Sequence, residues 1–383
     1  MNIFAIDLGN HRIKMKSDRG EYNYPASYLS AEHVGIRSIS GIKTENNFCY
    51  ELEEDRGYRF LWGEDLGIYN LPEKIIDAYA RSGRMKQKKA QRILKFALGR
   101  LALDYKESRN KPLIVHLMLG VPVTDLHEES ETITLLHELV VGQHHIQIDN
   151  EEIMIEIPSI DYVSIVPQYM GTLMEMAFDE EMQQVEDYAK GKIGLVDIGG
   201  GTILINSVNH MTPSPVGTES FEGVNTLIKE IATKVNSTKK FSIEQTLRVG
   251  NKKTGYIYRP NRNEADTRDI TEIVENEIEK YTRFTVAPLV TSSFPDLEEV
   301  DLIVLTGGGV NVISHQALLD EIGERYISRL VFVENAEQAN VRGFYKGAYL
   351  LWKDSKEAPR ETVALEERIM HPSESLYTVE KEK

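Results

Sequence analysis

Residues 196–202 constrain the fold more than any other part of this 383-residue chain. They read Val-Asp-Ile-Gly-Gly-Gly-Thr and lie between two apolar runs, a pattern that predicts a strand, a glycine turn and a returning strand. Because glycine has no Cβ, the turn amides can approach an anion closely. Asp197, directly before the turn, can hold Mg²⁺ through water. The donors at the turn are Gly199, Gly200, Gly201 and the hydroxyl of Thr202. A glycine hairpin without a ligand is the alternative.

A second segment, near the N-terminus, repeats this pattern. Residues 3–15 form an apolar strand that ends in Asp7, a turn that contains Gly9, and a returning strand that carries Lys14. Two such units predict two similar halves, each of which offers a phosphate-binding hairpin to a shared cleft.

A third glycine cluster follows the apolar strand at residues 302–305 and consists of Gly307, Gly308 and Gly309. This pattern is typical of a turn that lets a flat ring lie against the backbone. The chain contains no G-x-x-x-x-G-K-[ST] loop, and no strand is followed by G-x-G-x-x-G, so the P-loop and dinucleotide-binding classes are excluded.

In this order, the three segments resemble the phosphate-1, phosphate-2 and adenosine motifs of the actin, heat-shock chaperone and sugar kinase superfamily. The resemblance extends from Asp7 to Gly343, and it is greatest to the bacterial actin-like proteins of plasmid segregation, the ParM type. Those proteins carry an Ala-Asn-x-x-Gly-aromatic segment similar to residues 339–344.

The resemblance implies an α/β, actin-like (ribonuclease H-like) duplicated fold of two domains with a nucleotide cleft between the halves. Domain I is expected at 1–190, with a small subdomain at roughly 17–110 that meets the next protomer, and with 340–383 packing back on it. Domain II is expected at 191–339.

The resemblance also implies the roles of single residues around ATP or GTP and Mg²⁺. Asp7 and Asp197 hold the water shell of the metal, and Lys14 resembles the lysine that reaches the phosphates in actins. The two turns clamp the phosphates, the first through the backbone of Leu8, Gly9, Asn10 and His11. Gly223, before a helix expected at 225–235, is a further candidate near the sugar and base.

Gln168 matches the water-positioning residue of the family, which is often Glu in plasmid-segregation actins and Gln in eukaryotic actins. The segment at 163–174 is expected to begin a helix, with Pro167 near its first turn. A glutamine orients a water by hydrogen bonding and is no strong general base, which implies slow hydrolysis. A solvent-facing or capping glutamine is the alternative.

Charge limits the possible partners. The net charge of -16 and the pI of about 5.2 argue against direct, non-specific DNA binding. A lone cysteine, Cys49, excludes an internal disulfide. With no leader pattern and no apolar run of about 20 residues, we expect a soluble cytoplasmic protein without a membrane partner.

The combined reading is a filament-forming ATPase, possibly also a GTPase, that polymerises with nucleotide. It would segregate plasmid DNA through an adaptor bound to a centromere-like site, with further copies of itself as filament protomers. A non-polymerising small-molecule kinase or regulatory ATPase of the same fold stays open, as does a phage or cell-shape actin homologue. No segment matches the aspartate base that sugar kinases need.

Several local predictions accompany this reading. Helical spacing predicts a helix at 74–105, a strand at 112–121 contains His116, and a further helix covers 270–288. His144 and His145 are expected at the surface, Ser242 as an N-cap, and 251–269 as an exposed loop. A basic cluster is either a docking patch or a solvated helix face; its members are Arg84, Lys86, Lys88, Lys89, Arg92 and Lys95.

Overall fold

The computed structural model describes residues 1–34, 46–64, 66–69, 71–78, 80, 83–122, 126, 131–213, 218–260 and 264–353. The chain divides into two compact units, Met1–Val185 with Asn340–Lys383, and Glu186–Ala339. These are called unit 1 and unit 2. The predicted C-terminal segment at 340–383 lies outside the described residues from 354 onward.

Unit 1 is built on an 11-stranded mixed sheet in the order β3-β2-β1-β8-β10-β9-β5-β6-β4-β7, with β11 also paired to β8. The hairpin predicted at the N-terminus is confirmed, since β1 pairs antiparallel with β2 and parallel with β8. The strands are β1 (Asn2–Leu8), β2 (Arg12–Lys16), β3 (Glu21–Pro25), β4 (Ser27–Ser30), β5 (Asn47–Leu52), β6 (Phe60–Gly63), β7 (Ile76–Asp77), β8 (Leu113–Val121), β9 (Gly142–Ile148), β10 (Glu151–Ile157) and β11 (Val163–Pro167).

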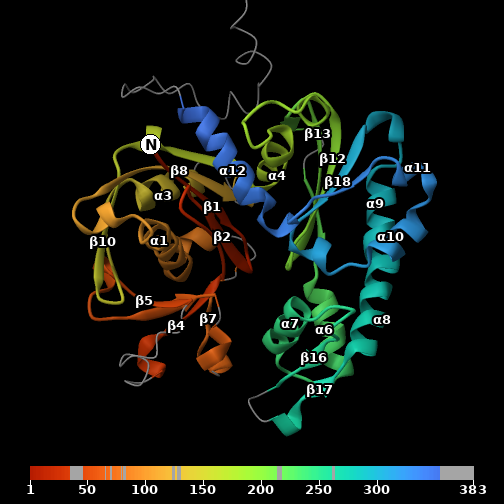
Figure 1. Cartoon of the computed structure of the whole chain (residues 1–383), viewed down its shortest axis with the longest axis horizontal. Helices are drawn as coiled ribbons and strands as arrows, with labels where there is room; N and C mark the ends of the chain where they lie inside the picture. The colour runs from red at the N-terminus through yellow and green to blue at the C-terminus, as the bar shows by residue number, and fades with distance from the viewer. Residues whose placement is uncertain are drawn as a thin grey trace, which may run out of the picture. The chain divides into compact units, whose positions relative to one another are not determined.

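Helices cover both faces of the central strands of unit 1 (Figure 1). Along β1, Phe4, Ile6 and Leu8 belong to the core that contains α1 (Lys88–Ala102), whereas Ile3 and Ala5 pack with α12 (Ala336–Trp352). Burial on both faces explains why β1 and β8 read as continuous apolar runs. The other α-helices among the described residues of unit 1 include α3 (Glu131–Val140) and α4 (Gln168–Ala177).

Unit 2 contains a six-stranded sheet in the order β14-β13-β12-β18-β19, with β15 paired to β13. The glycine hairpin predicted at residues 196–202 is confirmed, because β12 and β13 pair antiparallel and bring Ile198 opposite Ile203. The strands are β12 (Lys192–Ile198), β13 (Thr202–Asn209), β14 (Thr212–Pro213), β15 (Glu219–Glu222), β18 (Leu302–Thr306) and β19 (Leu330–Phe332).

The helices of unit 2 include α6, α7 and a long helix that is interrupted by a π-turn at Thr282–Val286. The helix predicted at 270–288 is therefore confirmed, and a two-stranded ribbon of β16 (Ile257–Tyr258) and β17 (Arg268–Asp269) precedes it. The bounds are α5 (Glu186–Ala189), α6 (Asn225–Lys234), α7 (Lys240–Val249), α8 (Thr271–Tyr281), α9 (Ala287–Ser293), α10 (His315–Ile322) and α11 (Glu324–Ile327).

The secondary structure predicted for three segments was wrong in part. Within the described part of 74–105 the α-helix is confined to α1, because Gly83 adopts a left-handed φ of 58° and a 3-10 turn precedes the helix. Residues 163–167 form β11, because their backbone pairs with β8 and their β-branched side chains favour a strand, and the helix begins only at Gln168. The loop predicted at 251–269 contains the β16–β17 ribbon, with Tyr256 and Tyr258 buried.

Two predicted positions of single residues were also wrong. His144 lies on β9 with its side chain buried, and its Nε2 is 2.7 Å from the Val140 carbonyl oxygen, because strand alternation turns it inward. Burial lowers the pKa of His144. Ser242 lies inside α7, which begins at Lys240, so it is not the N-cap.

The described residues contain no helix that is both long and apolar enough to cross a bilayer. Cys49 is a free, partly buried thiol.

Candidate functional site

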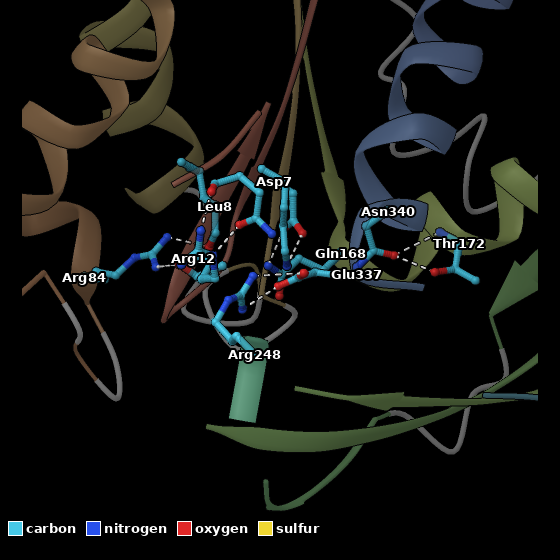
Figure 2. Close-up of polar contacts among 12 residues, drawn as sticks. Asp7, Leu8, Arg12, Arg84, Gln168, Thr172, Arg248, Glu337 and Asn340 are labelled. Carbon is cyan, nitrogen blue, oxygen red and sulfur yellow. Dashed lines mark hydrogen bonds and ion pairs between the residues drawn. The ribbon is translucent and has the colours of Figure 1, made fainter. Parts of the chain in front are cut away.

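Asp7, at the end of β1, is the centre of the candidate site in unit 1. Its side chain is fully buried, and its two carboxylate oxygens face two different partners (Figure 2). Lys14 Nζ lies 3.0 Å from Oδ2, and the Gln168 side-chain amide donates to Oδ1 at 2.5 Å. The β1–β2 register places Asp7 directly opposite Lys14, so the hairpin itself creates this ion pair.

The strand order of unit 1 explains why Gln168 reaches Asp7. On β8, Gly120 pairs with Asp7 of β1 on one side and with Val166 of β11 on the other. Pro167 then ends β11, and Gln168 begins α4. A residue 161 positions away in the sequence is thereby brought into hydrogen-bond contact with the carboxylate.

The turn that follows Asp7 is held by Arg84, a residue that sequence reasoning assigned to the basic cluster. Its guanidinium donates to the carbonyl oxygens of Leu8 at 2.5 Å and of Gly9 at 2.7 Å (Figure 2). It also donates to Asn10 Oδ1 at 3.3 Å, and only 3% of Arg84 is exposed. Arg84 is therefore a buried residue whose hydrogen bonds stabilise the turn, and we call this its bracing role. Its partners lie about 75 positions earlier in the chain, so no local pattern could have revealed it.

The rest of the basic cluster is largely paired with carboxylates. Arg92 makes two bonds to Asp55, at 2.7 and 2.8 Å, and these hydrogen bonds lower the pKa of the Asp55 carboxyl. Lys95 pairs with Glu54, and Lys86 pairs with Glu131. The cluster is therefore neither a helix face that is simply solvated nor a continuous patch of unpaired cations.

In unit 2, the glycine turn after Asp197 packs against the start of α6. The amides of Gly223, Val224 and Asn225 donate to the carbonyls of the three turn glycines at 3.0, 3.1 and 2.8 Å. A Cβ on Gly223 would lie 2.4 Å from the Gly199 carbonyl oxygen. Glycine at this position therefore allows the helix to approach the turn.

The third glycine cluster lies beside Asp197, because β18 runs parallel to β12 and pairs Thr306 with Asp197. Gly307 has a φ of 86°, and a Cβ there would lie 2.2 Å from Asp197 Oδ1. A Cβ on Gly309 would lie 2.3 Å from Ile198 Cγ2. The structure thus gathers Asp197, the turn at 199–202, Gly223 and the cluster at 307–309 within unit 2.

Glu337 and Arg248 form an ion pair next to this cluster that sequence reasoning missed. Arg248 donates to both carboxylate oxygens, at 2.9 and 3.1 Å (Figure 2). A Cβ on Gly308 would come within 3.5 Å of Glu337 Oε1. The two partners are 89 positions apart, so only the fold brings them together.

The donor set suits phosphate and a hard cation. A Cβ on Gly9, Gly199, Gly307 or Gly309 would lie less than 3.0 Å from another protein atom, and glycine turns of this kind present backbone close to any bound group. The described residues contain no cluster of three or more His, Cys, Asp or Glu side chains that could hold a metal directly. A single carboxylate at each turn fits Mg²⁺, which keeps several of its waters and is shared with phosphate oxygens.

Two family models match successive parts of the chain. Residues 5–171 match the N-terminal domain of actin-like proteins, and residues 192–338 match the Alp7A C-terminal domain. The chain belongs to the bacterial actin-like proteins. The actin-like fold predicted from the sequence is thereby confirmed, as is the resemblance to the ParM type.

Solved structures of actin-like proteins match almost the whole chain. An apo ParM of pSK41 has a TM-score of 0.70 at 19% identity, over 92% of this chain and 98% of that one. Alp7A has a TM-score of 0.69 at 15% identity, over 91% and 96%. Bacillus thuringiensis ParM, solved with ATP, has a TM-score of 0.64 at 16% identity, over 92% and 100%. No curated protein sequence matches the chain.

Proposed function

We propose that this actin-like protein is a slow ATPase, possibly also a GTPase, that polymerises with nucleotide to segregate plasmid DNA. The observation that carries the proposal is the contact of Gln168 and Lys14 with the buried carboxylate of Asp7, directly beside a glycine turn. Support comes from the similar Bacillus thuringiensis ParM, which was solved with ATP, and from a similar Alp12 structure, which is a filament.

The residues present fit a nucleoside triphosphate with Mg²⁺. In unit 1 the turn of Leu8 to His11 would bind phosphate through its backbone, and Lys14 would offset phosphate charge. In unit 2 the turn of Gly199 to Thr202 would do the same, while Gly223 and the cluster at 307–309 would receive the sugar and base. Asp7 and Asp197 would hold the water shell of the metal, which supplies charge neutralisation of the phosphates when bound.

Gln168 is the residue that we assign to positioning the attacking water. Its side-chain amide already donates one hydrogen bond to Asp7, which fixes the orientation of the side chain. The amide oxygen of the same group stays available to accept a hydrogen bond from a water, since an amide donates through nitrogen and accepts through oxygen. A glutamine cannot take the proton as a strong base, so we expect hydrolysis to be slow and to act as a timer.

Polymerisation would couple to this chemistry through a population shift. Nucleotide in the protein would favour the conformation that binds the next protomer, and hydrolysis would reduce that preference; such coupling requires different affinities of the two conformations for the triphosphate. Because the chain carries a net charge of -16, DNA would be held by an adaptor bound to a centromere-like site. We place the protein in the cytoplasm.

The test is right-angle light scattering with pelleting of the purified protein in Mg-ATP, Mg-GTP or a non-hydrolysable analogue. We expect scattering to rise above a critical concentration, to decay later with ATP and to persist with the analogue. Slow hydrolysis with no rise in any nucleotide would reject the filament and favour a non-polymerising kinase or regulatory ATPase of the same fold.

Gln168→Ala separates hydrolysis from assembly. It should assemble with ATP but lower the rate of phosphate release by about 100-fold, the loss typical of one oriented polar group in an active site. Gln143→Ala, at an exposed glutamine of the same unit, is the matched control and should hydrolyse as the unmodified protein does. Equal rates in the two variants would reject the role of Gln168.

A further inference from the structure

Unit 2 of this acidic protein carries a strongly basic segment. Residues 234–259 contain one acidic residue, Glu244, and seven basic ones: Lys234, Lys239, Lys240, Arg248, Lys252, Lys253 and Arg259. Three of the seven are engaged within unit 2, since Lys234 pairs with Glu277, Arg248 pairs with Glu337, and Lys239 donates to the Pro260 carbonyl. The other four are exposed, and none of them has a carboxylate partner among the described residues. The segment itself therefore carries an excess of positive charge, while the paired strand β17 places Asp269 opposite Ile257.

Two of these lysines lie at the tip of a rigid turn. The Gly255 amide donates to the Asn251 carbonyl at 2.8 Å and closes the turn. Asn251 Oδ1 accepts from the amides of Lys253 and Thr254 at 2.9 and 3.0 Å. The Tyr256 amide donates to Thr271 Oγ1 at 2.7 Å and fastens the turn to α8. Lys252 and Lys253 are thus displayed with little backbone freedom left to lose on binding.

Exposed apolar side chains flank this turn. Val249, the last residue of α7, is 75% exposed, and Ile257 on β16 is 36% exposed. Apolar side chains surrounded by charge are typical of a protein–protein contact, whereas a DNA-binding surface contacts phosphate mainly through cations and polar groups. We call residues 249–257 the lysine turn.

An acidic pocket lies elsewhere on unit 2. Its volume is about 340 Å³, and it is lined by Glu186, Asp187, Lys190, Gly191, Asp301 and Leu302. Lys190 pairs with Glu186 at 2.8 Å, so Asp187 and Asp301 supply the excess negative charge. The half-buried Leu302 adds an apolar wall. Charge and apolar character both complement the lysine turn.

The turn and the pocket lie at opposite ends of β12. The pocket residues lie just before β12 and at the start of β18, whereas α6 starts against the glycine turn at the other end of β12, and α7 and β16 follow α6 (Figure 1). Seven residues of strand separate the two ends by roughly 20 Å. Two different complementary patches make a heterologous contact, which repeats into an open filament unless it closes into a ring.

We infer that the lysine turn of one copy docks in the acidic pocket of the next copy of this chain. The inference rests on the proposed function, since it names a contact of the filament. The contact accounts for a basic segment in a chain whose net charge is negative, and it requires no partner other than a second copy.

Two charge reversals test the contact. Variant T carries Lys252→Glu and Lys253→Glu, and variant P carries Glu186→Lys and Asp187→Lys. Alone, each should raise the critical concentration for assembly with the non-hydrolysable analogue at least tenfold. An equimolar mixture should assemble close to the unmodified protein, because the reversed turn of T fits the reversed pocket of P, and the native turn of P fits the native pocket of T. Rescue by mixing also shows that both variants are folded.

The control is Lys111→Glu with Lys353→Glu, which makes the same charge change at exposed lysines of unit 1 outside the 17–110 subdomain and should leave assembly unchanged. If the unmodified protein assembles and the mixture stays as poor as either variant, or if T assembles normally, the docking is wrong and the proposed function stands. The turn is a nucleic-acid surface if the unmodified protein retards duplex DNA in a gel, T does not retard it, and T assembles normally. If the unmodified protein never assembles, the proposed function and the contact are both rejected.

Discussion

Replacing Arg84 by methionine should weaken unit 1 and the turn after Asp7 far more than replacing its neighbours in the basic cluster. Methionine keeps much of the buried volume but removes the donors to the Leu8 and Gly9 carbonyls. Hydrogen bonds from a charged donor contribute about 1.5–3 kcal/mol each. Since water can reach part of the turn after the change, we expect less than the full sum, a loss of about 2–4 kcal/mol in the free energy of unfolding.

Urea unfolding followed by tryptophan fluorescence measures this loss. Both tryptophans of the chain, Trp62 and Trp352, lie in unit 1, so the signal reports on the unit that contains Arg84. A titration with nucleotide gives the second readout. We expect the dissociation constant of the nucleotide to rise roughly tenfold, which is a loss of about 1.4 kcal/mol in binding free energy, because the turn must be reordered on binding.

Lys88→Met is the matched control, since Lys88 belongs to the same cluster in the sequence but is exposed at the start of α1. Exposed substitutions of this kind change stability by less than about 0.5 kcal/mol. The bracing role of Arg84 is refuted if Arg84→Met and Lys88→Met have the same unfolding free energy and the same nucleotide affinity.

Three further predictions concern a glycine of unit 2, the packing of α12 and the burial of His116 on β8. Gly307→Ala should lower nucleotide affinity at least tenfold, because its Cβ would lie 2.2 Å from Asp197 Oδ1. The control is Gly323→Ala, where the glycine has a similar φ of 81° but open space around it, and this variant should keep the affinity. Equal losses of affinity in the two variants would contradict the prediction. Asn340→Ala should lower the free energy of unfolding in urea by about 1–3 kcal/mol, since Asn340 Oδ1 accepts from both the amide and the hydroxyl of buried Thr172 (Figure 2). A loss no larger than that of Asn110→Ala, at an exposed asparagine, would disprove it. Burial lowers the pKa of His116 to about 4, so the unfolded chain takes up the proton first and stability is lost as the pH falls from about 6.5 toward 4. His116→Phe should reduce this loss, and His145→Phe, at a more exposed histidine, should not; identical pH profiles would argue against the burial of a neutral His116.

The sequence revealed those parts of the site that are local in the chain. The two hairpins follow from apolar runs that flank glycine turns, and the Asp7–Lys14 pair follows from the antiparallel register once the hairpin is recognised. The positions of Asp197 and the turn glycines were predicted for the same reason. Whether these residues bind nucleotide stays a prediction.

Sequence periodicity gave wrong predictions where a strand and a neighbouring helix or loop contain similar residues. Residues 163–167 are apolar and precede a true helix, and pairing with β8 makes them a strand. His144 appeared polar and exposed, and strand alternation buries it beside Val140. In both cases the neighbouring strands, which lie far away in the chain, determined the outcome.

By itself, then, the sequence determined the hairpins, their carboxylates and the family, because strand periodicity and glycine turns are encoded within a dozen neighbouring residues. Only the tertiary structure decided that Gln168 meets Asp7, that Arg84 braces the turn, and that Glu337 pairs with Arg248. These contacts join residues 161, about 75 and 89 positions apart. Such pairs depend on the order of strands in the sheet and on helix packing, which no local pattern of residue types specifies.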